Sequence, residues 1–220
     1  MIWTLPNILT LLRLFAAPLL VLAVLLLPRP YADIVAVLLF VGASATDWID
    51  GYLARKWDQT SKLGTMLDPI ADKAMVAVAL LILVTYSSLN FLILLPAALI
   101  LFREVFVSGL REYLGDTAGT LKVTQLAKWK TTVQMVAISA LLAQGIFEHY
   151  VVMRSWGMDG QIIAQIMAGG VSDDTGLRGV FYAMRITGDC GLWLLWLAAV
   201  LTVVTGVDYF RKALPHLKED

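Results

Sequence analysis

Four aspartates, Asp47, Asp50, Asp68 and Asp72, lie within a short stretch between strongly apolar segments. The first two are three residues apart and the last two are four apart, so on helices each pair points to one face. Carboxylates beside or inside a membrane span are costly unless a counter-charge accompanies them. Hard divalent cations take oxygen ligands, and Mg²⁺ is usually held together with substrate phosphates. The aspartates therefore predict a site for Mg²⁺ or Mn²⁺, most simply for two ions.

The positions of these aspartates suit a phosphoryl transfer. Two metal ions held by Asp47, Asp50 and Asp68 can stabilise the attacking and leaving oxygens. Asp72 is one turn beyond Asp68, close enough to share a metal yet able to face an acceptor hydroxyl, and is the predicted general base. Pro69 suits the first turn of a helix, where a missing N–H costs nothing. Ion pairing with nearby Lys and Arg is the alternative role, but it explains neither the spacing nor the glycines of this stretch.

The spacing resembles the whole signature of the CDP-alcohol phosphatidyltransferases, a family of integral membrane enzymes. It consists of Asp47, Asp50-Gly51, Ala54-Arg55, Gly64, Asp68 and Asp72. The resemblance implies the all-α CDP-alcohol phosphotransferase fold, four metal-binding aspartates, and Asp72 as proton acceptor. It also implies that the CDP headgroup of a lipid substrate is held by two groups of residues, namely Gly51, Arg55 and Ser61, and Pro6, Asn7 and Thr10 near the N-terminus. Taken alone, Asn7 or Thr10 would equally pass as a helix cap or an ordinary span residue.

Longer blocks over residues 5–145 are similar to the bacterial phosphatidylglycerophosphate synthases of this family. They include PNILTLLR, LDPIADK, REVFVSGLRE and AKWKTTVQM. The resemblance implies CDP-diacylglycerol and glycerol 3-phosphate as substrates, and it is compatible with a homodimer. The acceptor's phosphate dianion calls for cations beside the metal site, and the candidates are Arg103, Arg111, Lys128 and Lys130. Inositol phosphate, serine or phosphatidylglycerol is the alternative acceptor within the family.

Hydrophobic residues make up 59% of the 220 and charged residues only 15%, which is typical of a membrane protein. The net charge of zero gives no reason to expect nucleic acid as a partner. About six spans, near the roughly 20 residues that a bilayer requires, are expected in a single domain of residues 1–220. Their limits are 8–27, 31–54, 69–86, 90–111, 124–147 and 188–209. Residues 148–187 are expected to form an extended loop with amphipathic or disordered structure.

Lys and Arg gather in alternate connections, which sets the orientation by the positive-inside rule. Arg55, Lys56 and Lys62 lie between the second and third spans, whereas the third connection has neither Lys nor Arg. Both termini and the aspartates are therefore expected on the cytoplasmic side of a bacterial inner membrane, in contact with its lipids. A cation transporter is the alternative of a different class, but it predicts carboxylates near mid-membrane with a path to both faces.

Overall fold

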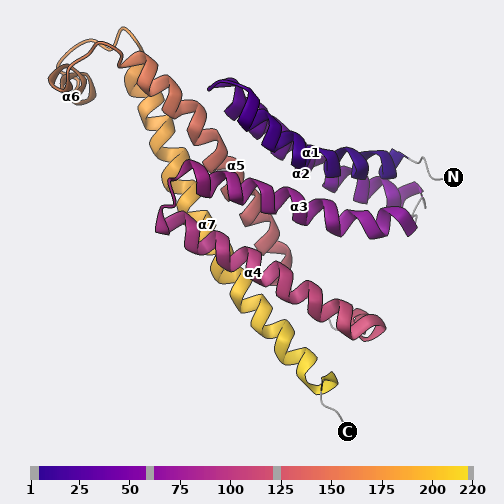
Figure 1. The fold of residues 1–220 in the computed structure, drawn as a ribbon. Coiled ribbons are helices and arrows are strands. Elements are labelled where there is room, and N and C mark those ends of the chain that lie inside the picture. The colour runs from indigo at the N-terminus through magenta and orange to yellow at the C-terminus, as the bar shows by residue number, and fades with distance from the viewer. Residues whose placement is uncertain (1–4, 58–61, 121–124, 218–220) are drawn as a thin grey trace. The chain divides into compact units, whose positions relative to one another are not determined.

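The computed structural model describes residues 5–57, 62–120 and 125–217, and within these ranges every regular element is helical (Figure 1). Six of its α-helices have at least 22 residues. They are α1 (Leu5–Leu26), α2 (Tyr31–Trp57), α3 (Lys62–Tyr86), α4 (Phe91–Leu114), α5 (Gln125–Arg154) and α7 (Leu177–Ala213). The shorter elements are α6 (Gly160–Ala168) and the 3-10 turns η1 (Gly115–Thr120) and η2 (Leu214–His216). The predicted all-α class is confirmed.

Each expected membrane span coincides with one of the long helices. Within the described ranges, four stretches are long and apolar enough to cross a bilayer: Asn7–Leu26, Phe91–Leu114, Trp129–Arg154 and Leu177–His216. The described apolar stretch of α2, Tyr31–Thr46, is shorter. Helix α3 begins with polar residues that include the second pair of aspartates. The chain is therefore a multi-pass membrane protein.

Two compact units make up the chain, and three helices contribute residues to both. Unit 1 consists of Met1–Val78 and Ser139–Gly191, and unit 2 consists of Ala79–Ile138 and Leu192–Asp220. The second pair of aspartates belongs to unit 1. Arg103, Arg111 and Lys130 belong to unit 2.

In unit 1, α1 and α2 lie side by side (Figure 1). Each of the two helices buries apolar side chains at helical spacing. On α2, Ala32, Ala36 and Phe40 follow one another at four-residue spacing, so they share one face, and each is at most 1% exposed. On α1, Ala16 and Leu20 are buried at the same spacing. Alanines at a helix contact let the backbones approach closely, which is the usual packing inside a membrane.

Glycines bring α5 and α7 together within unit 1. A Cβ atom placed on Gly188 would lie 2.7 Å from Gln144 Nε2, and one on Gly191 would lie 2.8 Å from Leu141 Cγ. Both distances are shorter than a van der Waals contact. Any larger residue at Gly191 must therefore displace the branched part of Leu141.

Residues 148–187 are not one extended loop, and most of them are helical. Helix α5 continues to Arg154 and α7 begins at Leu177, with α6 between them. The Asp173 carboxylate accepts hydrogen bonds from the backbone N–H groups of Leu177 and Arg178, at 2.8 and 2.9 Å, and so caps the first turn of α7. Desolvation opposes ionisation of Asp173, but these hydrogen bonds outweigh it and hold its pKa below the usual value. Composition had suggested a loop because polar and glycine residues cluster at these helix ends.

The expected place of Pro69 at the start of a helix is also wrong. Helix α3 begins at Lys62, so Pro69 lies inside it. Proline removes one backbone hydrogen bond from a helix interior. Membrane helices tolerate this because neighbouring helices and side chains satisfy the freed groups, and α1 and α4 also contain an interior proline.

We expect Gly191→Ala to lower the free energy of unfolding by about 1–3 kcal/mol, because it overpacks the contact between α5 and α7. Gly179 on the same helix has no atom within 4 Å of its Cβ position apart from the backbone of its own helix and its chain neighbours. Gly179→Ala is the matched control and should be neutral, or stabilising by up to about 1 kcal/mol. Unfolding in mixed micelles of mild detergent and dodecyl sulfate, followed by circular dichroism, measures both. Equal stability of the two variants would contradict the close packing.

Candidate active site

Two side chains of α1 hold the two aspartates of α3 in unit 1. Thr10 Oγ1 donates a hydrogen bond of 2.6 Å to Asp68 Oδ1. Arg13 Nη1 donates to Asp72 Oδ1, also at 2.6 Å, and forms an ion pair with it. Thr10 and Arg13 are three residues apart and the aspartates are four apart, so the members of each pair lie about one helical turn apart on one face. Successive turns of α1 therefore contact successive turns of α3.

The face of α1 that carries these donors is polar and buried. Asn7, Thr10 and Arg13 recur every three residues, and each is at most 3% exposed. In an otherwise apolar helix, buried polar groups must find partners. The sequence therefore directs this face of α1 toward polar residues of a neighbouring helix, and α3 provides them.

Only one member of the Arg13–Asp72 pair is buried. The Arg13 side chain is 1% exposed, whereas that of Asp72 is 39% exposed. A buried guanidinium thus fixes the orientation of a carboxylate that solvent or a ligand can still reach. Such a carboxylate can accept a proton from a bound hydroxyl without first having to be oriented.

Asp68 and Asp72 provide carboxylate oxygens on successive turns of one helix, which suits Mg²⁺ or Mn²⁺. The hydrogen bond from Thr10 to Asp68 is the kind of outer contact that orients a metal-binding carboxylate. Among the side chains that the structure describes, no three His, Cys, Asp or Glu residues gather into a group that could hold a metal ion.

Several predicted site residues lie on described helices, but their side chains lie outside the described part of the chain. On α2 these are Asp47, Asp50, Gly51 and Arg55, on α1 Pro6, and on α5 Lys128. Ser61 lies outside the described residues altogether. A site that gathers all four aspartates stays a prediction.

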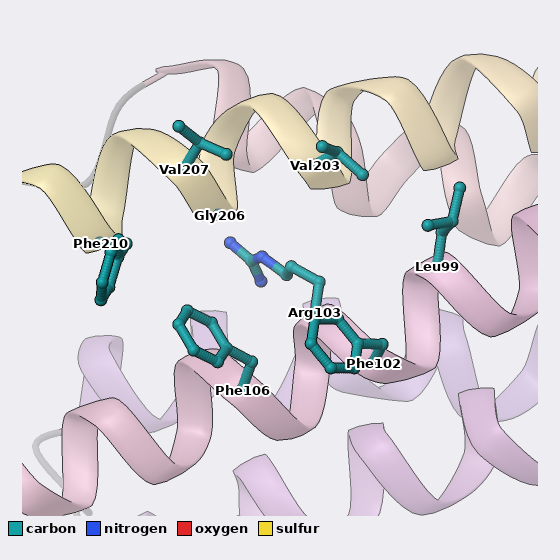
Figure 2. Close-up of a pocket in the computed structure, with 8 residues that line it drawn as sticks. All are labelled: Leu99, Phe102, Arg103, Phe106, Val203, Gly206, Val207 and Phe210. Carbon is teal, nitrogen blue, oxygen red and sulfur yellow. The ribbon is translucent and has the colours of Figure 1, made fainter.

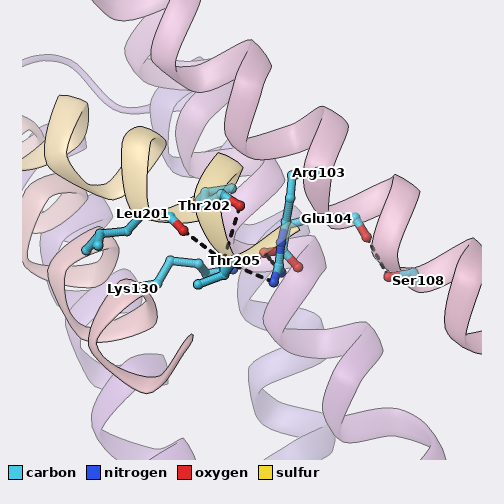
Figure 3. A network of polar contacts seen from close by, with 7 residues as sticks. All are labelled: Arg103, Glu104, Ser108, Lys130, Leu201, Thr202 and Thr205. Atoms are coloured by element: carbon cyan, nitrogen blue, oxygen red, sulfur yellow. Dashed lines mark hydrogen bonds and ion pairs between the residues drawn. The ribbon is translucent and has the colours of Figure 1, made fainter. Parts of the chain in front are cut away.

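In unit 2, two of the four predicted phosphate-binding cations share one carboxylate (Figure 3). Lys130 Nζ of α5 and Arg103 Nη1 of α4 both donate to Glu104 Oε1 of α4, the latter at 3.2 Å. Arg103 Nη2 also donates to Thr205 Oγ1 of α7, at 3.4 Å. These four residues are called the α4–α5–α7 network below.

Arg103 reaches this network past a glycine. Its side chain extends from α4 toward α7 at Gly206 (Figure 2), where an added Cβ would lie 2.9 Å from Arg103 Cγ. A mostly apolar groove of about 290 Å³ surrounds it. The lining residues are Leu99, Phe102, Arg103, Phe106, Val203, Gly206, Val207 and Phe210. Two turns further along α4, the Arg111 guanidinium lies over the Tyr209 ring, 5.2 Å from its centroid.

Sequence reasoning did not assign two of these partners, Arg13 and Glu104. Both are charged residues inside apolar helices, and such residues need a partner of opposite charge. The sequence therefore contained a signal that Arg13 and Glu104 each need a partner. The sequence alone could not say which opposite charge each would meet, because the partner of Arg13 lies 59 residues away.

Comparison with known proteins gives a consistent result. The model of the CDP-alcohol phosphatidyltransferase family matches residues 3–204. A protein of Cereibacter sphaeroides named CDP-diacylglycerol–glycerol-3-phosphate 3-phosphatidyltransferase is 53% identical over 99% of both chains. Proteins with the same name from Rickettsia bellii and Pectobacterium atrosepticum are 37% and 44% identical. They match 94% and 64% of this chain, and 93% and 77% of their own lengths.

A double-mutant cycle tests the Arg13–Asp72 pair. Breaking a fully buried pair costs roughly 3–5 kcal/mol, but water reaches Asp72, so we expect Arg13→Gln to cost only about 1–3 kcal/mol. Arg13→Gln combined with Asp72→Asn should be more stable than the sum of the single effects, because no unpaired charge is left. Unfolding in mixed micelles provides the free energies. Strictly additive effects would show that the two side chains do not interact.

Proposed function

Because the chain belongs to the CDP-alcohol phosphatidyltransferase family, we propose that it transfers the phosphatidyl group of CDP-diacylglycerol to glycerol 3-phosphate. The products are phosphatidylglycerophosphate and CMP. The observation that carries this proposal is the similarity, along the whole chain, to a relative named for that reaction. The contacts of α1 with Asp68 and Asp72 support it independently, because they hold two carboxylates in fixed positions on one helix.

Asp72 is the proposed general base. It takes the proton of the primary hydroxyl of glycerol 3-phosphate, and the oxygen attacks the phosphorus that carries the diacylglycerol. The bond from this phosphorus to the oxygen bridging to CMP breaks, and CMP leaves with the electron pair. Arg13 keeps the carboxylate oriented toward the hydroxyl throughout. Direct displacement is favoured because the sequence pairs no Ser or Cys with a basic His.

Asp47, Asp50, Asp68 and Asp72 are the proposed ligands for divalent ions, of which there are two in the simplest arrangement. Bound Mg²⁺ or Mn²⁺ supplies positive charge that stabilises the pyrophosphate oxygens during the transfer. Thr10 contributes by holding Asp68 through its hydroxyl. Pro6, Asn7, Gly51, Arg55 and Ser61 are the proposed contacts of the CDP headgroup.

Arg103, Arg111, Lys128 and Lys130 are the proposed ligands of the acceptor's phosphate. Arg103 and Lys130 donate to the same oxygen of Glu104, so the two cations can donate to a single anion. Two cations directed at one point suit the dianion of a phosphomonoester better than the carboxylate of serine, whose single negative charge is accompanied by an ammonium group. This favours glycerol 3-phosphate over serine.

We place the enzyme in the bacterial inner membrane, with its site on the cytoplasmic side. Arg55 and Lys56 in the last turn of α2 and Lys62 at the start of α3 support this orientation. Membrane lipids surround the acyl chains of the substrate, and a homodimer is the proposed assembly.

Purified protein in detergent, supplied with CDP-diacylglycerol and Mg²⁺ or Mn²⁺, tests the proposed reaction. Glycerol 3-phosphate, serine, inositol phosphate and phosphatidylglycerol are offered separately. We expect glycerol 3-phosphate alone to give stoichiometric CMP and phosphatidylglycerophosphate, both identified by mass spectrometry. Turnover with another acceptor in its place would retain the family but reject the proposed acceptor.

Asp72→Asn is the variant for the same assay, and we expect a folded protein whose kcat is lower by roughly 10²- to 10⁴-fold. Gly179→Ala, which changes a residue with no neighbour at its Cβ position, should keep normal turnover. Near-normal activity of Asp72→Asn would refute its assignment as the base.

A further inference from the structure

The Glu104 carboxylate occupies the point at which Arg103 and Lys130 converge. Both cations donate to the same atom, Oε1, rather than one to each carboxylate oxygen. Figure 3 shows the three side chains meeting between α4 and α5. An external anion that binds both cations at this point must take the position of Glu104 Oε1.

Burial explains why an anion is present there. The side chains of Lys130 and Arg103 are only 6% and 14% exposed. Two cations buried without a counter-ion would be strongly destabilising, because their lost hydration is not replaced. Glu104 supplies the missing negative charge, and at 21% exposure it is the most accessible of the three side chains. The carboxylate can therefore move toward water more easily than either cation can.

Buried polar atoms without hydrogen-bond partners occur about one helical turn from residues of the network. Within the described part of the chain, these include Gln134 Oε1, Thr202 Oγ1 and Tyr209 Oη. Each of the three residues is at most 6% exposed. Gln134 is one turn from Lys130 on α5, while Thr202 and Tyr209 are about one turn on either side of Thr205 on α7, so they share the faces of the network. Buried groups left unsatisfied in this way indicate a polar ligand or water.

We propose that Glu104 is a built-in counter-ion, which the phosphate of the acceptor displaces, and that it thereby selects dianionic acceptors. With Glu104 in place, the two cations retain one uncompensated positive charge. A phosphate dianion in place of the carboxylate neutralises both cations. A monoanion has the same charge as the Glu104 carboxylate, so it gains no electrostatic stabilisation by displacing it. This inference rests on the proposed function, since it concerns the acceptor of the same reaction. Glu104 touches the cations and not the reacting atoms, so it determines specificity without being a catalytic residue.

Calorimetric titration of the purified protein, without the lipid donor, tests this proposal at pH 8. The probes are inorganic phosphate, glycerol 3-phosphate, and the methyl ester of glycerol 3-phosphate, which is a monoanion. Wild type should bind the first two and exclude the ester. Glu104→Gln removes the competing charge while keeping the shape of the side chain. It should bind glycerol 3-phosphate at least about 5-fold more tightly and should bind the ester measurably.

Ser108→Ala is the matched control, because Ser108 Oγ donates to the backbone oxygen of Glu104, at 2.5 Å, and its removal keeps the negative charge at position 104. It should bind all three probes as wild type does. The proposal is overturned if Glu104→Gln binds glycerol 3-phosphate more weakly and still excludes the ester. In that case Glu104 stays in place and orients the cations.

If glutamine at position 104 prevents folding, Glu104→Asp provides the test. A carboxylate one methylene shorter holds the cations less closely, so phosphate affinity should again rise, and a fall contradicts the proposal. Because these titrations need no turnover, they separate the two claims. If wild type does not catalyse the proposed reaction, the binding of the three probes still tests the role of Glu104. If Glu104→Gln binds the probes as wild type does, the role of Glu104 fails but the proposed reaction does not.

Discussion

A charge inside an apolar helix must be compensated by another group in the protein, and this constraint governs both polar regions of the molecule. In unit 1, the buried guanidinium of Arg13 is compensated by Asp72, and the buried hydroxyl of Thr10 donates to Asp68. Neither contact could be replaced by water, because the donors on α1 are almost fully enclosed. The polar face of α1 thus fixes the position of α3 and, with it, the orientation of two carboxylates. A requirement of membrane folding therefore holds two acidic groups in fixed orientations, as a functional site needs.

The same constraint has a different result in unit 2. There the buried charges are two cations, and Glu104 compensates both through one oxygen. A cation pair that is already neutralised in part can exchange its anion for another of higher charge. Unit 1 therefore holds its carboxylates by donors that are almost fully enclosed, whereas unit 2 holds its cations by a carboxylate that we propose a ligand displaces. The glycine at position 206 makes the second arrangement possible, because it leaves room for the stem of Arg103 beside α7.

Helix number and type could be predicted from the sequence because apolar runs of about 20 residues have few alternatives in a bilayer. The places of particular residues within the helices were harder to predict. Pro69 was expected to begin a helix, but α3 already begins at Lys62 and Pro69 lies inside it. Residues 148–187 read as a loop, although Asp173 caps a helix that begins there. The pairing of Arg13 with Asp72 depends on the rotation of two helices that are distant in sequence. A single sequence contains no direct signal for that rotation.

The central claim is that the aspartates which α1 holds on α3 are ligands for divalent ions. Electron paramagnetic resonance of Mn²⁺ titrated into the purified protein measures this directly, through the loss of the free-ion signal. The account predicts that wild type binds Mn²⁺ and that Asp68→Asn and Thr10→Val each weaken binding by roughly 10- to 100-fold. Thr85→Val, which removes a hydroxyl bonded only within α3, should bind Mn²⁺ as wild type does. Unchanged Mn²⁺ affinity in Asp68→Asn would contradict the account.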